Sequence, residues 1–143
     1  MYILLRVVIG SVFIVSSLGK LLSPYQNFLY VIQAYQLLPS WGEVLTAQVF
    51  PWIELTIGVF VFIGLWTPWA LRGALVLFGV FVLVLGQALL RGLPLESCGC
   101  FGAWIHLKPQ TVIVMDSLSL ILASILLRNL SRARKFSFDS YFD

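Results

Sequence analysis

The sequence predicts an all-α integral membrane protein, built as a four-transmembrane-helix bundle with a short interfacial helix in the first outer loop. Hydrophobic residues make up 60% of the chain, charged residues 10%, and the mean hydropathy is +0.98. A soluble domain is nearer half apolar and a quarter charged. This composition excludes a water-soluble enzyme, a disordered chain and a nucleic-acid-binding protein, and 143 residues allow one domain.

Charged residues divide the chain into apolar segments, each close to the roughly 20 residues that cross a hydrocarbon core. The transmembrane domain is expected over residues 1–130, with spans at about 3–22, 44–66, 71–90 and 110–128, before a polar tail over 131–143. Arg6 and Lys20 fall within the first span and are expected to snorkel toward opposite interfaces. Ser17-Leu18-Gly19 also fits a signal-peptide cleavage site, but Lys20 follows at once and the apolar character resumes.

The first outer loop is predicted to contain a short helix. Ser23-Pro24 is a typical helix start and Pro39 a stop. Between them, apolar and aromatic residues recur at helical spacing, which indicates a helix lying in the membrane interface. The alternative is a structured loop that caps the bundle.

The distribution of basic residues predicts the orientation of the chain. Four spans place both termini and the second-to-third loop on one side of the membrane. That side carries Arg6, Arg72, Arg128, Arg132, Arg134 and Lys135, and the other carries Lys20, Arg91 and Lys108. The positive-inside rule therefore favours cytoplasmic termini, with the third-to-fourth loop extracytoplasmic. A bacterial inner (cell) membrane is the expected location.

Both cysteines of the protein lie in that outer loop, in the motif Glu96-Ser-Cys-Gly-Cys-Phe-Gly102. Gly99 lets the backbone fold so that the sulfurs of Cys98 and Cys100 can meet. A disulfide closing so small a ring should be strained, and hence easier to reduce than a structural disulfide. An oxidising outer compartment suits this chemistry.

Two other interpretations of this motif remain open. Cys98, Cys100 and His106 could form a metal site, although three ligands fall short of the shell that zinc or copper prefers. The cysteines could otherwise form a permanent staple of the loop, or be two idle thiols.

A second group of polar residues falls inside the predicted spans. Lys20, Glu54, Gln87 and Asp116 come one from each span and are expected to face a shared half-cavity beneath the cysteine loop. They could serve a proton relay or a small-molecule pocket, or Lys20 could simply pair with Glu54 or Asp116 and fix helix order. Close helix packing is expected at small-residue stripes that include Gly10, Gly58, Gly79 and Gly86.

Several of these motifs resemble the DoxX-like membrane protein superfamily. They are Gly19-Lys20-Leu21-Leu22 with Ser23-Pro24, Tyr35-Gln-Leu-Leu-Pro39, and Pro51-Trp-Ile-Glu54-Leu-Thr-Ile-Gly58. The Cys98-Gly-Cys-Phe-Gly102 loop is similar to the methylamine-utilisation branch, the MauE family, and the resemblance covers about residues 5–128. It implies a four-helix membrane bundle that takes part in maturing the disulfide-rich small subunit of methylamine dehydrogenase, beside a thioredoxin-like partner.

Three function hypotheses follow. The first is a thiol–disulfide oxidoreductase that passes oxidising equivalents through Cys98 and Cys100 to an extracytoplasmic thioredoxin-like protein or disulfide-rich client. Its reoxidation would need an acceptor, for which we consider a quinone held near Lys20, Glu54 and Asp116. The second is a non-enzymatic subunit that anchors or assembles a larger respiratory or electron-transfer complex. The third is a metal-handling or transport protein.

Overall fold

The computed structural model describes residues 1–94, 106–133 and 141, and within this part every regular element is a helix. The long helices are α1 (Tyr2–Leu21), α3 (Ser40–Ile63), α4 (Thr67–Leu90) and α5 (Pro109–Arg128), and the short ones are α2 (Tyr25–Tyr35) and α6 (Leu130–Ala133). The four long helices are each long and apolar enough to cross a membrane. The all-α, four-helix membrane fold is therefore confirmed.

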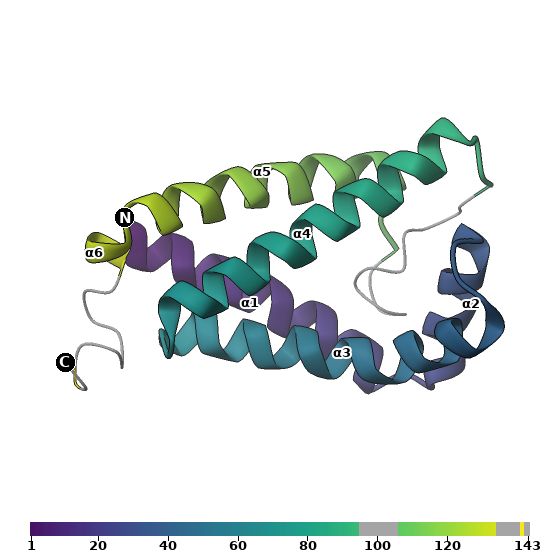
Figure 1. Ribbon diagram of the computed structural model, residues 1–143, viewed down its shortest axis with the longest axis horizontal. Coiled ribbons are helices and arrows are strands. Elements are labelled where there is room, and N and C mark those ends of the chain that lie inside the picture. The colour runs from purple at the N-terminus through teal and green to yellow at the C-terminus, as the bar shows by residue number, and fades with distance from the viewer. Residues whose placement is uncertain (95–105, 134–140, 142–143) are drawn as a thin grey trace.

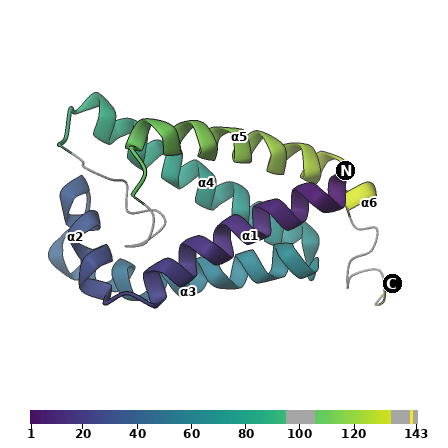
Figure 2. The same cartoon turned by 180° about the vertical axis from the view of Figure 1, so that it is seen from behind.

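The long helices form two pairs, which lie one above the other in Figure 1. In each pair the helices lie along one another: α1 packs on α3 and α4 packs on α5, while α3 also contacts α4. Successive long helices reverse direction, so that the N-terminus and α6 lie at one end and α2 at the other (Figures 1 and 2). The ends of α1 and α4 and the starts of α3 and α5 consequently meet at the α2 end.

The turn between the second and third spans differs from the expected boundaries of 44–66 and 71–90. The helix α3 ends at Ile63 because Gly64 adopts a left-handed conformation with φ 81°, and Trp66 follows with φ 48°. Arg72 lies within α4, where its guanidinium carbon is 4.9 Å from the ring centre of Trp69. The helix α4 thus begins at Thr67, before the expected limit at 71, and includes the stacked arginine.

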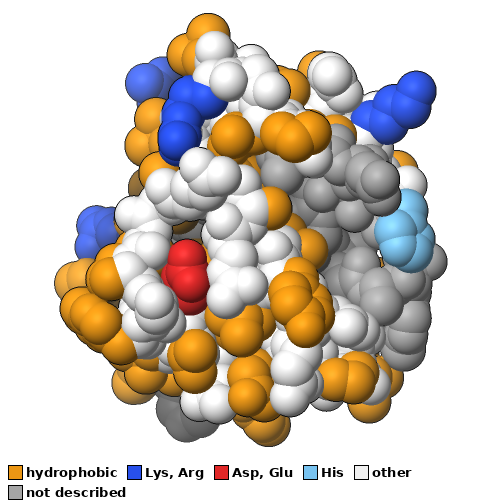
Figure 3. All heavy atoms as spheres, turned by 90° about the vertical axis from the view of Figure 1, so that its right-hand side faces the viewer, with side chains coloured by type: hydrophobic (Ala, Val, Ile, Leu, Met, Phe, Trp, Pro, Cys, Tyr) orange, Lys and Arg blue, Asp and Glu red, His pale blue; other side chains and the backbone are white. Residues whose placement is uncertain are grey.

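The short helix predicted in the first outer loop is present as α2. It follows Pro24 and ends where Gln36 turns left-handed with φ 52°. Its principal neighbour is α3. Figure 3 shows the α2 end of the molecule, where hydrophobic side chains are widespread and lysine and arginine side chains lie toward the edges.

The apolar core is divided between the two ends. The larger cluster comprises Ile9, Phe13, Val61, Ala70, Leu71, Ala74, Leu77, Phe78, Ala123 and Leu126. At its centre, the rings of Phe13 and Phe78 lie 4.6 Å apart. The smaller cluster comprises Tyr35, Leu85, Ala88 and Val112. It includes a residue of α2 and has fewer buried members than the larger cluster.

Glycines bring α1 and α3 into close contact. A Cβ atom at Gly10 would lie 2.8 Å from the backbone of Phe62, and one at Gly58 would lie 2.8 Å from the Cβ of Phe13. The expectation of close packing at small residues holds here. It is wrong for Gly79 and Gly86 of α4, because a Cβ at Gly79 would meet no atom within 4 Å and one at Gly86 only Ile113 at 3.9 Å.

Candidate functional site

A buried ion pair joins α1 to α3. The ammonium Nζ of Lys20, in the last turn of α1, lies 2.7 Å from Oε2 of Glu54, and the exposed fractions of these side chains are 0% and 1%. Arg6 at the other end of α1 is also buried. The expectation that Arg6 and Lys20 snorkel is therefore wrong, and for Lys20 the reason is that a carboxylate inside the bundle neutralises its charge.

A serine completes the hydrogen bonding of this pair. The hydroxyl of Ser16 donates to Oε1 of Glu54 over 2.8 Å, and Lys20 Nζ donates to Ser16 Oγ over 3.1 Å. Both carboxylate oxygens thus accept a hydrogen bond, which offsets part of the cost of burying the charges. Ser16 was missed in the sequence, although it precedes Lys20 by four residues and so lies on the same face of the helix.

The helix α3 presents Glu54 on the face that packs against α1. Pro51, Glu54 and Gly58 are all buried and follow one another at spacings of three and four residues, which places them on one stripe. Gly58 permits the close approach of α1 one turn beyond Glu54. This approach brings the carboxylate within reach of Lys20.

Three phenylalanine rings surround the lysine ammonium. The distances from Lys20 Nζ to the ring centres of Phe28, Phe50 and Phe81 are 5.0, 5.5 and 5.3 Å. We call these residues the phenylalanine cage. They come from α2, α3 and α4, so the sequence gives no local signal for the cage. Ring faces attract cations, which further stabilises the buried ammonium.

Asp116 lies near the ion pair without a bond to it. It is 8% exposed on α5 and interacts electrostatically with both Lys20 and Glu54. Its Oδ2 is buried and has no hydrogen-bond partner among the residues that the structure describes. The site therefore gathers two carboxyl groups and one amine inside the bundle, and the amine is already paired with Glu54.

Gln87 forms a hydrogen bond at the end of α4. Its Oε1 accepts a hydrogen bond of 3.2 Å from Arg91, which also donates to the backbone carbonyl of Tyr35 over 3.4 Å. Gln87 thus helps to tie the end of α4 to the end of α2. No hydrogen bond joins it to Lys20, Glu54 or Asp116 within the described ranges.

The cysteine motif and the alternative metal site with His106 belong to the segment between α4 and α5. Cys98 and Cys100 lie outside the described residues, and His106 is exposed. In the described part of the chain, no three histidine, cysteine, aspartate or glutamate residues gather in a way that could hold a metal ion.

Four helices that are long and apolar enough to cross a membrane make this a multi-pass membrane protein. The buried ion pair gives it a polar site in the interior of the bundle. Comparison with protein families identifies it further, because the family described as methylamine utilisation protein MauE matches residues 1–129. The chain belongs to the MauE family and is thus a membrane protein associated with methylamine utilisation. Neither the curated proteins nor the solved structures contain a match.

Proposed function

We propose that this protein is a thiol–disulfide redox protein that supplies disulfide bonds to an extracytoplasmic partner. The partner is a thioredoxin-like protein or a disulfide-rich client, and membership of the MauE family suggests maturation of methylamine dehydrogenase. The observation that carries the proposal is the Cys98-Gly-Cys100 motif, which contains every cysteine of the chain.

The position of the motif along the chain supports this chemistry. It lies between Leu90, the last residue of α4, and Pro109, the first residue of α5. These two helix ends are at the α2 end of the bundle (Figure 2). The last turn of α1, which carries Lys20, lies at the same end. The positive-inside rule favours an extracytoplasmic position for this end, where disulfides persist.

The proposed reaction is an exchange between two disulfides. A thiolate of the client attacks one sulfur of the Cys98–Cys100 disulfide and forms a mixed disulfide, and the other cysteine leaves as a thiolate. A second client thiolate then attacks the mixed disulfide. The client gains a disulfide, and Cys98 and Cys100 are released in reduced form. Reoxidation of the pair must remove two electrons and two protons.

The buried charge cluster is suited to the proton part of this cycle. Glu54 and Asp116 are carboxyl groups in the bundle interior, and Lys20 couples to both. Carboxyl groups inside a membrane protein commonly form proton relays. We assign Lys20, Glu54 and Asp116 to the uptake and release of protons that accompany reoxidation. Gln87 is assigned to no step because its Oε1 is bound by Arg91.

Trapping the cysteines in whole cells tests the proposal. Free thiols are blocked with a maleimide reagent that shifts the protein on a gel, and the Cys100→Ser variant is searched for a mixed disulfide with a partner. We expect a cycling mixture of oxidised and reduced native protein, a mixed disulfide in the variant, and loss of client oxidation in the C98S/C100S variant. Ser97→Ala is the matched control, because it alters the same loop and keeps both cysteines.

A pair that is oxidised at all times, together with normal client oxidation in the C98S/C100S variant, would contradict the proposal. That outcome would favour the alternative of a non-enzymatic subunit that anchors or assembles a larger electron-transfer complex.

A further inference from the structure

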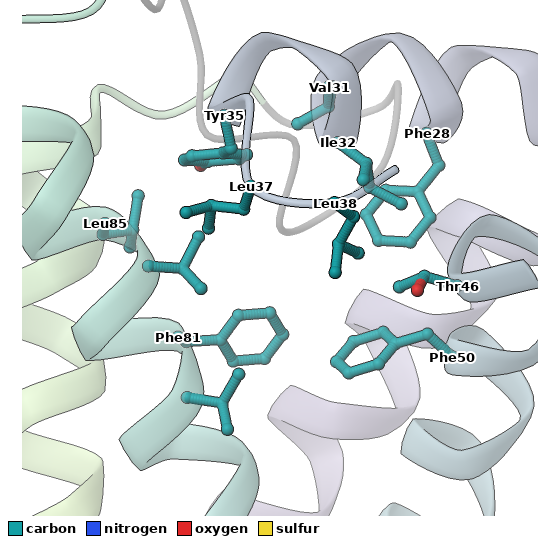
Figure 4. Close-up of a pocket in the computed structure, with 12 residues that line it drawn as sticks. Phe28, Val31, Ile32, Tyr35, Leu37, Leu38, Thr46, Phe50, Phe81 and Leu85 are labelled. Carbon is teal, nitrogen blue, oxygen red and sulfur yellow. The ribbon is translucent and has the colours of Figure 1, made fainter. Parts of the chain in front are cut away.

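An apolar pocket opens beside the phenylalanine cage. It has a volume of about 250 Å³ and lies between α2 with its following turn, α3 and α4. In Figure 4, Phe50 and Phe81 face each other across its lower part, and Leu37 and Leu38 project into it from the turn. Thr46 and Tyr35 are the lining residues that carry a side-chain hydroxyl. We call this cavity the α2 pocket.

The α2 pocket reaches the surface of the bundle on α4. Val80 lines the pocket and is 42% exposed. The neighbouring face of α4 is apolar and exposed as well, with Val76 at 64% and Leu83 at 73%. Because α4 is a membrane-spanning helix, a molecule dissolved in the bilayer can enter here without crossing water.

The walls of the pocket are in contact with the buried ion pair. The cage residues Phe28, Phe50 and Phe81 all line the pocket, and the same rings lie within 5.5 Å of the Lys20 ammonium. A ligand in the α2 pocket is thus separated from the ammonium end of the ion pair by single aromatic rings. This pair is a dipole in a dry environment, where electrostatic interactions are stronger than in water.

These features select the chemistry of the ligand. Nearly all lining side chains are hydrocarbon, so a charged or strongly polar molecule would lose hydration without compensation. Phe50 and Phe81 meet edge to face with ring centres 5.5 Å apart, and Phe28 and Phe50 are tilted at 6.2 Å. Such an array gives a flat ring both stacking and edge contacts. The rings lie beside the ammonium end of the ion pair, and this orientation favours a ring that accepts electrons.

We infer that the α2 pocket binds the ring of a lipid-soluble quinone, which is the oxidant that regenerates the cysteine pair. The redox part of this inference rests on the proposed function, but the binding part does not. The step balances: two thiols form one disulfide, and their two electrons and two protons convert the quinone to a hydroquinone.

Binding is tested on the full chain in phosphatidylcholine nanodiscs free of quinone, with ubiquinone-1 as the probe in calorimetric titrations. Val84→Phe and Val80→Phe place a ring inside the pocket, and we expect each to weaken binding by at least about tenfold. Val76→Phe is the matched control, since it makes the same change on the exposed face of α4 outside the pocket. We expect it to change binding by less than about twofold.

Circular dichroism first shows that Val84→Phe and Val80→Phe retain the native helix content. The inference is overturned if both variants then bind ubiquinone-1 as tightly as the native protein does. A second measurement separates the quinone ring from a lipid tail. A phosphatidylcholine with a photoreactive acyl chain is cross-linked to the protein, and the labelled peptides are mapped. Labelling of the α2 pocket that ubiquinone-1 suppresses supports the inference, and labelling there that the quinone leaves unchanged overturns it.

The two proposals fail in different ways. Native protein that binds ubiquinone-1 in the α2 pocket but never reduces it, even with Cys98 and Cys100 reduced, contradicts the thiol–disulfide function and leaves the binding site standing. Native protein that oxidises its client but binds no quinone contradicts the inference alone.

Discussion

The helix α3 has two unlike sides. Toward α1 it forms a closed seam, where Gly10 and Gly58 allow backbone contact and the Lys20–Glu54 pair joins the two helices. Toward α4 and α2 it borders a pocket of about 250 Å³. Lipid tails are as apolar as leucine, so hydrophobicity alone does not hold membrane helices together. The difference teaches that the α1–α3 seam is held by small residues and an ion pair, whereas the side of α3 at the phenylalanine cage leaves a pocket open.

Glu54→Ala should weaken the seam most. It leaves the Lys20 ammonium buried without its counter-ion, and we expect a loss of about 3–5 kcal/mol in the free energy of unfolding. Unfolding in mixed micelles by a denaturing detergent measures this. The K20M/E54M variant removes both charges and should be more stable than Glu54→Ala. Equal stability of the single and double variants would show that the pair does not hold the seam.

Gly58→Ala should weaken the same seam by less. The added Cβ would meet Phe13 Cβ at 2.8 Å, so one helix must move, and we expect a loss of about 1–3 kcal/mol. The same unfolding measurement applies. A stability equal to that of the native protein would mean that α1 and α3 can separate without cost.

Phe28→Leu should have a moderate effect because it removes one ring of the phenylalanine cage, the ring centred 5.0 Å from Lys20 Nζ. We expect a loss of about 0.5–2 kcal/mol in the free energy of unfolding. Tyr30→Leu is the control, since Tyr30 lies on the same helix and is 68% exposed. If both variants lost the same stability, the effect would come from α2 as a whole and not from the cation.

Gly79→Ala should have the smallest effect, and of opposite sign. Its added Cβ meets nothing within 4 Å, and alanine is the better helix former by up to about 1 kcal/mol. We expect unchanged or slightly higher stability. A loss as large as that of Gly58→Ala would show that the open side of the bundle is also closely packed in the membrane.

The sequence was sufficient for the architecture because long apolar runs leave the backbone few options in a bilayer. It also supplied Lys20 and Glu54 as candidate partners, since charges inside spans must be compensated. It could not choose between Glu54 and Asp116 as the partner of Lys20, because this depends on which helices adjoin. The seam between α1 and α3 decides that choice.

Other parts of the site were beyond local sequence patterns. The phenylalanine cage draws one ring from each of three helices, and nothing in the spacing of these residues relates them. In the sequence, Gly79 of α4 looked like the glycines of α1 and α3, but a Cβ placed there would meet no atom within 4 Å. In a membrane protein lipid-facing and helix-facing surfaces are both apolar, so hydropathy does not distinguish them.

The separation of Lys20 and Glu54 along the chain bears on how the protein is made. The two residues are 34 positions apart, so a ribosome completes α1 well before α3 emerges. During that interval, a helix carrying an unneutralised ammonium is poorly soluble in lipid. We therefore expect synthesis of α3 to stabilise the integration of the first helix. Truncation before Glu54 should leave the nascent chain open to extraction and to quality-control proteolysis.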